Sequence, residues 1–152
     1  MPLLHQEVPP QSMVVINNAA FLNAAAPRLE FQAFVARYQP VLESQRKHEG
    51  AGLTMFEYRT YRLGDDKIVY AREARGSSLI RLMHFTLVTS QVALPRNVRI
   101  GMSKHAFEVA FHHKVPGDAA MVTEATYIPC RRYTFTFEHQ KLVKIDYELL
   151  LA

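Results

Sequence analysis

The spacing of apolar residues predicts two helices, one in each half of the chain. Pro27 suits the first turn of a helix over 28–38. The apolar residues of this segment are spaced two to four apart, which predicts one apolar face: Leu29, Phe31, Phe34, Val35 and Tyr38. Residues 104–113 form the second amphipathic segment, and the preceding Ser103 is the expected N-cap. Shorter helical segments are expected at 19–26, which is rich in alanine, and at 41–47.

Each predicted helix is followed by residues whose polarity alternates with a period of two. This pattern, broken by short turns such as Gly64-Asp65-Asp66 and Gly76-Ser77-Ser78, predicts antiparallel meanders. A β-branched run near the N-terminus predicts an additional edge strand. The expected strands are 13–16, 53–63, 67–75, 79–89, 120–128, 131–138 and 141–150.

The second half of the sequence resembles the first. Lys67-Ile68-Val69 and Lys141-Leu142-Val143 follow similar turns, and the helical segments match at nearly the same offset. We therefore predict an α+β fold in which two helix-plus-antiparallel-meander repeats, 28–90 and 98–151, share one core within a single domain, 1–152. The alternative is that two unrelated hairpins look alike because both alternate and turn. Residues 1–12, with three prolines, predict an extended arm.

One segment resembles a known family. Val98-Arg99-Ile100-Gly101-Met102-Ser103-Lys104 is similar to the entry motif of the SmpA/OmlA small lipoproteins, and residues 132–145 resemble their final hairpin. The doubled helix-plus-meander plan resembles the β-lactamase-inhibitor-protein-like (BLIP-like) fold. The resemblance covers residues 98–150. It departs from the family pattern at Pro116-Gly117, which stands in reversed order, and in lacking an N-terminal lipobox cysteine.

This resemblance implies a non-enzymatic envelope accessory, or an inhibitor or immunity-like protein, that acts by binding another protein. The compartment is left open by the sequence. Residues 1–5 lack the pattern of a secretory signal. We expect the periplasm or cell envelope if a signal peptide has been removed, and the cytoplasm otherwise.

Composition removes several functional classes. The chain has 49% hydrophobic and 21% charged residues, which is typical of a folded protein. No apolar run approaches the length of a transmembrane helix. The one cysteine, Cys130, excludes an intrachain disulfide. Two neighbouring arginines, Arg131 and Arg132, can favour a thiolate, but we expect a small, half-buried cysteine at the start of a strand. Because no nucleophile elbow, phosphate loop or dinucleotide fingerprint occurs, we expect neither enzymatic activity nor a cofactor.

Arginine and tyrosine in the first meander suggest a binding surface. These two residue types dominate protein interfaces because they bury a large area and still form hydrogen bonds. The net charge of +4 favours an acidic partner. The alternative is a solvated outer sheet face. The candidate partner-binding residues are Arg59, Tyr61, Arg72 and Arg81.

Histidines offer a second candidate chemistry. His105, Glu108 and His112 have the spacing of one helical face, where they would approach a metal together. The spacing matches no fixed metal motif, and a solvated helix face is the preferred explanation. We therefore predict no metal, with these three residues as the candidate ligands if one binds.

Two other functions remain open. A small-molecule carrier or enzyme would use a pocket between helix and sheet, lined by His84, His105 or His112. Nucleic-acid binding through a basic sheet is ranked last, because the sequence has no aromatic and glycine signature for it. A homodimer is also expected if the edge strands, which we place at 13–16 and 141–150, pair between chains. The identity of the partner does not follow from the sequence.

Overall fold

The strands form one mixed sheet of eight strands. The computed structural model describes residues 13–49, 55–73, 79–124 and 130–150. The strand order is β1-β6-β7-β8-β5-β4-β3-β2. Only the β1–β6 pair is parallel, and the other neighbours are antiparallel. The strands are β1 (Met13–Asn17), β2 (Val41–Glu49), β3 (Met55–Leu63), β4 (Asp66–Glu73), β5 (Ile80–Leu87), β6 (Ala119–Thr123), β7 (Cys130–Glu138) and β8 (Lys141–Leu150).

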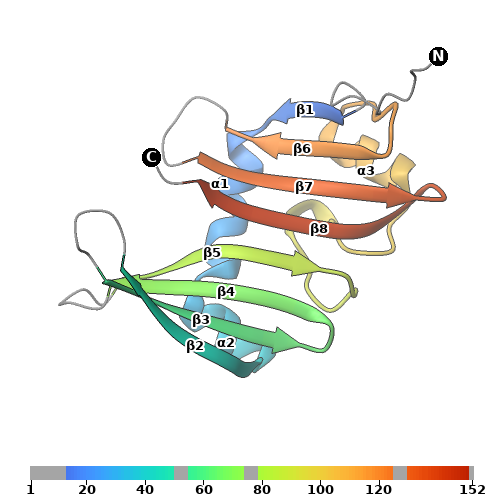
Figure 1. Cartoon of the computed structure of the whole chain (residues 1–152). Helices are drawn as coiled ribbons and strands as arrows, with labels where there is room; N and C mark the ends of the chain where they lie inside the picture. Colours follow the sequence, from blue (N-terminus) through green and yellow to red (C-terminus); the bar gives the residue numbers. More distant parts are fainter. Residues whose placement is uncertain (1–12, 50–54, 74–78, 125–129, 151–152) are drawn as a thin grey trace, which may run out of the picture.

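The helices lie on one face of this sheet (Figure 1). They are α1 (Ala19–Leu29), α2 (Phe31–Tyr38) and α3 (Lys104–Phe111), with a short 3-10 turn, η3 (Pro95–Asn97). None of the described helices is long and apolar enough to cross a membrane. The opposite face of the sheet is not covered by any described helix (Figure 1).

Side chains at the helix ends explain where the helices begin. Asn18 Oδ1 accepts a hydrogen bond from Phe21 N at 3.0 Å, which caps α1. Glu30 separates α1 from α2, and its carboxylate accepts from the first amides of α2. Ser103 Oγ accepts from Ala106 N at 3.0 Å, so the predicted N-cap of α3 is confirmed.

Aromatic side chains fill the space between helices and sheet. Phe21 of α1 is fully buried, and its ring centroid lies 4.9 Å from that of Phe111 and 5.3 Å from that of Tyr133. Phe107 of α3 packs 4.9 Å from Phe135 of β7. The core is therefore built between α1, α3 and the central strands.

The two halves of the sheet meet where β5 pairs with β8. This ladder runs from His84–Glu148 to Leu87–Ile145. Beyond His84 and Glu148 the two strands diverge, and α1 runs behind the gap (Figure 1).

The predicted architecture of two helix-plus-meander repeats is wrong. About 52% of the chain is strand and 25% is helical, and the strands belong to one eight-stranded mixed sheet. β1 also pairs in parallel with β6, far along the chain, so the second half of the sheet is completed by the first half of the sequence. The pattern along one meander does not reveal this long-range pairing.

Individual elements also differ from the prediction. Residues 41–47 are not helical but belong to the edge strand β2, and 28–38 spans the end of α1 and all of α2. The strand at 13–16 does lie at an edge, as predicted, whereas 141–150 is the central strand β8. The predicted arm at 1–12 lies outside the described residues.

Candidate binding surface

A row of long side chains crosses the uncovered face on four neighbouring strands. Arg46 of β2 pairs with Tyr58 of β3, Tyr58 with Ala71 of β4, and Ala71 with Arg81 of β5. Directly opposed residues project to the same face of a sheet. Because Tyr70, next to Ala71, is buried against the helices, this row lies on the uncovered face.

Two further cations lie on the same face, on β3 and β4. Arg62 is paired in register with Lys67. Glu43 forms an ion pair with Arg62. We call this surface the basic face and define it by five residues: Arg46, Tyr58, Arg62, Lys67 and Arg81.

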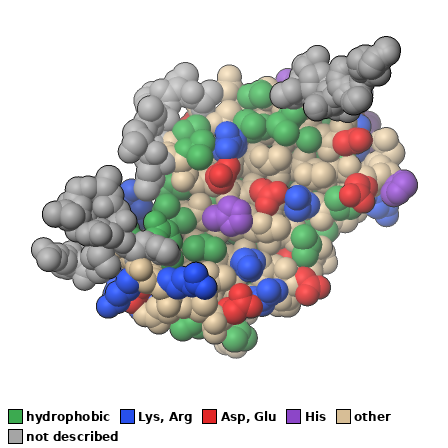
Figure 2. Space-filling view, viewed as in Figure 1, with side chains coloured by type: hydrophobic (Ala, Val, Ile, Leu, Met, Phe, Trp, Pro, Cys, Tyr) green, Lys and Arg blue, Asp and Glu red, His purple; other side chains and the backbone are tan. Residues whose placement is uncertain are grey.

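The basic face carries charge that its own surroundings leave uncompensated. Arg46, Lys67 and Arg81 are exposed. Within the described ranges, no carboxylate lies within 4 Å of their charged groups. Figure 2 shows blue side chains gathered over the lower half of this face, where β2–β5 lie.

The other half of the uncovered face is paired internally. Arg132 Nη2 lies 2.6 Å from Glu148 Oε1, and Lys144 Nζ lies 3.6 Å from Asp146 Oδ2. Thr86 Oγ1 also donates to Asp146 at 2.7 Å. The uncovered face therefore has a basic half on β2–β5 and a balanced half on β7 and β8.

The structure separates the four residues predicted to bind a partner. Arg81 lies on the uncovered face, but Arg59, Tyr61 and Arg72 project to the side that holds the helices, because Tyr61 pairs with the buried Ile68. Tyr61 is only 7% exposed, and its ring centroid lies 5.7 Å from that of Phe31. Tyr61 thus contributes to the core and offers little surface.

Arg59 and Arg72 both bind the carboxylate of Glu57. Their Nη2 atoms each lie 3.0 Å from Glu57 Oε1, and Gln45 Nε2 donates to Oε2 at 2.5 Å. The hydrogen bond from Gln45 and the two guanidinium groups lower the pKa of Glu57, against the opposing effect of burial. These residues form an internal ion-pair network on the helix side of the sheet.

The four other members of the basic face were missed by the sequence analysis. Two of them lie on β3, one residue out of phase with Arg59 and Tyr61, and the other two are their register partners on β2 and β4. The two-residue turn Gly64-Asp65 could have assigned these residues to a face, because it fixes the register of β3 against β4. The missed residues are Arg46, Tyr58, Arg62 and Lys67.

The candidate metal ligands lie near one another at the end of α3. His105, Glu108, His112 and His113 line a shallow depression. The helix ends at Phe111, and His112 takes a left-handed conformation with a φ of 53°. Glu108 Oε2 accepts from Val115 N at 2.7 Å. Among the described residues, no group of three histidine, cysteine or acidic side chains is arranged to hold a metal.

The remaining candidates occupy separate sites. His84 lies in a shallow polar depression of the uncovered face, beside Arg132, Asp146 and Glu148. It does not share a cavity with His105 or His112. Cys130 is a half-buried free thiol, and its Sγ lies 3.3 Å from Thr123 Oγ1.

Comparison of the chain with protein-family models, with curated proteins and with solved structures found no match. The resemblance of residues 98–150 to the SmpA/OmlA and BLIP-like proteins therefore stays a prediction.

Proposed function

We propose that this protein binds an acidic surface of another protein through the basic face and acts without catalysis. The observation that carries this proposal is the row from Arg46 to Arg81, whose cations have no carboxylate partner among the described residues. Arginines with a tyrosine between them are typical of interface hot spots. A negatively charged partner would supply the missing counter-charges.

The composition of the face favours a protein over a nucleic acid. Single-stranded nucleic acids are held by several aromatic side chains that stack on successive bases. Tyr58 is the one aromatic residue in the basic face. The basic surface does not continue onto the balanced half of the sheet, where Arg132 is paired with Glu148. The charge is therefore local, as expected for a limited patch on a protein partner.

Charge reversal on the two halves of the uncovered face tests this proposal. The wild-type protein and the variant R46E/R81E are used as bait in a native lysate, and captured proteins are quantified by mass spectrometry. The matched control is R132E/K144E, which reverses two cations in the balanced half. We expect a stoichiometric acidic partner whose purified form binds R46E/R81E at least about tenfold more weakly than wild type, with the control less affected.

Two outcomes would contradict the proposal. Equal loss of the partner in both variants would place the contact elsewhere or make it non-specific. Capture of nucleic acid in place of protein, with an affinity that falls steeply with salt, would favour the nucleic-acid alternative.

An envelope accessory, inhibitor or immunity role is a further prediction from the resemblance of residues 98–150, and the identity of the partner tests it. A homodimer through the exposed edge strands also stays a prediction.

A further inference from the structure

A cavity lies between α1 and the sheet where the two halves of the sheet meet. Because the β5–β8 ladder ends at His84–Glu148, Leu82 and Leu149 border a gap between diverging strands. α1 covers this gap and contributes Leu22, Ala26 and Leu29. The cavity has a volume of about 240 Å³ and is lined mainly by apolar side chains.

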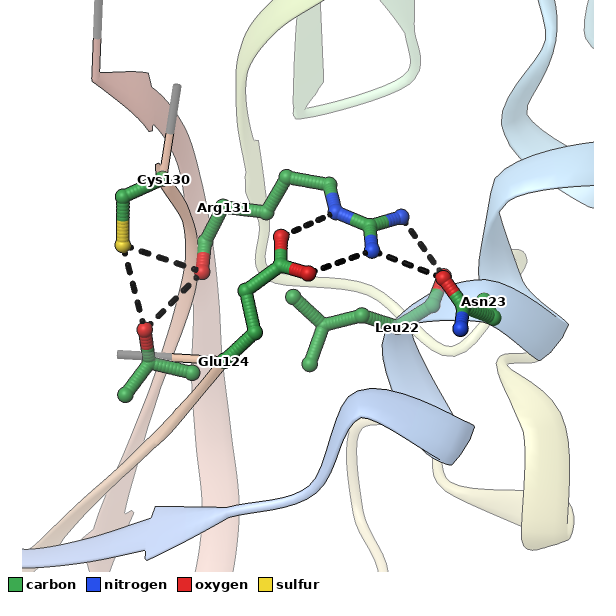
Figure 3. Close-up of polar contacts among 6 residues, drawn as sticks. Leu22, Asn23, Glu124, Cys130 and Arg131 are labelled. Atoms are coloured by element: carbon green, nitrogen blue, oxygen red, sulfur yellow. Dashed lines mark hydrogen bonds and ion pairs between the residues drawn. The ribbon is translucent and has the colours of Figure 1, made fainter. Parts of the chain in front are cut away.

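Arg131 is one of two arginines that line the cavity, and its guanidinium already has hydrogen-bond partners (Figure 3). Its Nε and Nη2 atoms lie 2.6 and 2.9 Å from the carboxylate oxygens of Glu124. Nη2 also donates to Asn23 Oδ1 at 2.7 Å, and Nη1 donates to Leu22 O at 3.4 Å. The hydrogen bonds from Arg131 lower the pKa of Glu124, so both groups stay ionised and neutralise each other.

Two tyrosine hydroxyls at the cavity have no hydrogen-bond partner among the described residues. Tyr133 is 2% exposed and Tyr147 is 5% exposed, and both line the cavity. No described side-chain oxygen or nitrogen that is sealed from solvent lacks a hydrogen-bond partner, so each of these hydroxyls keeps some contact with solvent. Burial raises the pKa of Tyr147 to about 12 and that of Tyr133 well above its ordinary value. Both groups are therefore neutral O–H donors at physiological pH.

Unpartnered hydroxyls in an apolar cavity define what would bind there. Because these hydroxyls reach solvent, water can accept their hydrogen bonds when the site is empty, and a ligand oxygen would take the place of that water. An anionic ligand gains little, because the charge of Arg131 is balanced by Glu124 and the lining holds one further cation, Arg81, and one anion, Glu30. A cavity of about 150 Å³ holds benzene, so the volume here accommodates about one ring with a short substituent.

We propose that this cavity binds a small neutral molecule with one apolar ring and a carbonyl oxygen, which accepts hydrogen bonds from Tyr133 and Tyr147. The site lies on the helix side of the sheet, and Arg81 is the one residue of the basic face that also lines it. It differs from the pocket expected from the sequence, because its polar groups are tyrosines and not His84, His105 or His112.

Acetophenone and benzoate are matched probes for this site, because they have similar rings and differ in charge. Binding is measured by isothermal titration calorimetry and by ligand-observed NMR. We expect wild type to bind acetophenone with a Kd below about 1 mM and more tightly than benzoate. The variants Y133F and Y147F should each bind acetophenone roughly fivefold to tenfold more weakly, because each loses one donor without losing the ring.

Three further variants separate a specific site from general apolar binding. Y61F removes a hydroxyl from the core outside the cavity, and it should bind acetophenone as wild type does. A26L adds bulk to the cavity wall on α1, and it should abolish binding while the unfolding temperature stays near that of wild type. E124Q removes the counter-charge of Arg131, and it should shift the preference toward benzoate.

The proposal is overturned if wild type binds neither probe with a Kd below about 1 mM. It is also overturned if Y133F, Y147F and A26L all bind acetophenone as tightly as wild type does. Neither result would depend on whether the basic face binds a protein partner.

Discussion

Glu57 is a buried carboxylate whose partners come from three strands. Gln45 lies on β2, Arg59 on β3 and Arg72 on β4. The carboxylate is only 5% exposed as a residue and is satisfied by one amide and two guanidinium groups. Its pKa is lowered because these partners favour the ionised form. Glu57 thus links the three strands at the end of the sheet farthest from α3.

We predict that Glu57 makes the protein less stable in acid. Its folded pKa lies below its ordinary value of about 4.5, so its stabilising effect is present above that value and is lost as pH falls through the folded pKa. In E57Q this contribution is absent at every pH. Urea unfolding between about pH 6 and about pH 3 should therefore give a free energy of unfolding that falls less steeply for E57Q than for wild type. Parallel curves for the two proteins would contradict this role.

The faces of β3 show what residue patterns can and cannot predict. The sequence implies that Arg59 and Tyr61 share one face of β3, because they are two residues apart. It did not identify that face as the one covered by helices, because aromatic and charged residues occur on both sides of β3. The register of the Gly64-Asp65 turn against the buried Ile68 decides the question, and it requires pairing two strands rather than analysing one.

The edge strand β2 is the element whose structure differs most from the helix propensity of its residues. Residues 41–47 contain good helix formers, and all of their side chains are exposed, yet they form β2. The chain enters β2 after Gln39, which ends α2 in a left-handed conformation. β2 then pairs along β3 through backbone hydrogen bonds. Pairing with β3 overrides the helix propensity of these residues, and their side-chain pattern does not predict a strand.

Asp66 fixes the position of two strand ends, and we predict that its removal is strongly destabilising. It begins β4, is fully buried, and its Oδ1 accepts from Val88 N at 2.6 Å and Thr89 N at 2.9 Å. Oδ2 accepts from Thr89 Oγ1 at 2.6 Å. D66A should lower the free energy of unfolding by about 3 kcal/mol, because buried donors lose a charged acceptor.

Two variants control this prediction, with urea unfolding as the measurement. D66N keeps one acceptor oxygen and should lose less than D66A. D65A changes the exposed neighbour in the same turn and should stay within about 0.5 kcal/mol of wild type. A loss in D65A equal to that in D66A would mean that turn conformation, and not the buried hydrogen bonds, determines the effect.

At the scale of the whole molecule, α1 joins parts of the chain that are far apart in sequence. Phe21 contacts Phe111 of α3 and Phe135 of β7, while Leu29 accepts a hydrogen bond from Tyr70 of β4 at 2.8 Å. α1 therefore contacts both halves of the sheet. The sequence predicted helical segments with an apolar face, but not this order of strands, because apolar patterns do not identify which strands are neighbours.

We predict that F21A destabilises the whole molecule by about 4 kcal/mol and that unfolding stays cooperative. The measurement is urea unfolding followed by far-UV circular dichroism and by tyrosine fluorescence, whose transitions should coincide. V109A, which truncates a side chain that is 57% exposed on α3, is the control and should change stability by less than about 0.5 kcal/mol. Two separate transitions in F21A would show that β2–β5 unfolds independently.

The parallel pairing of β1 with β6 also constrains the order of events during synthesis. Asn17 leaves the ribosome long before Thr123, its partner in the ladder. At ordinary elongation rates of about 5–20 residues per second, β1 waits roughly five to twenty seconds for β6. Until then its apolar residues, including Ile16, have no native neighbour strand. Nascent chains arrested before β6 should therefore be substrates for chaperones that hold apolar segments.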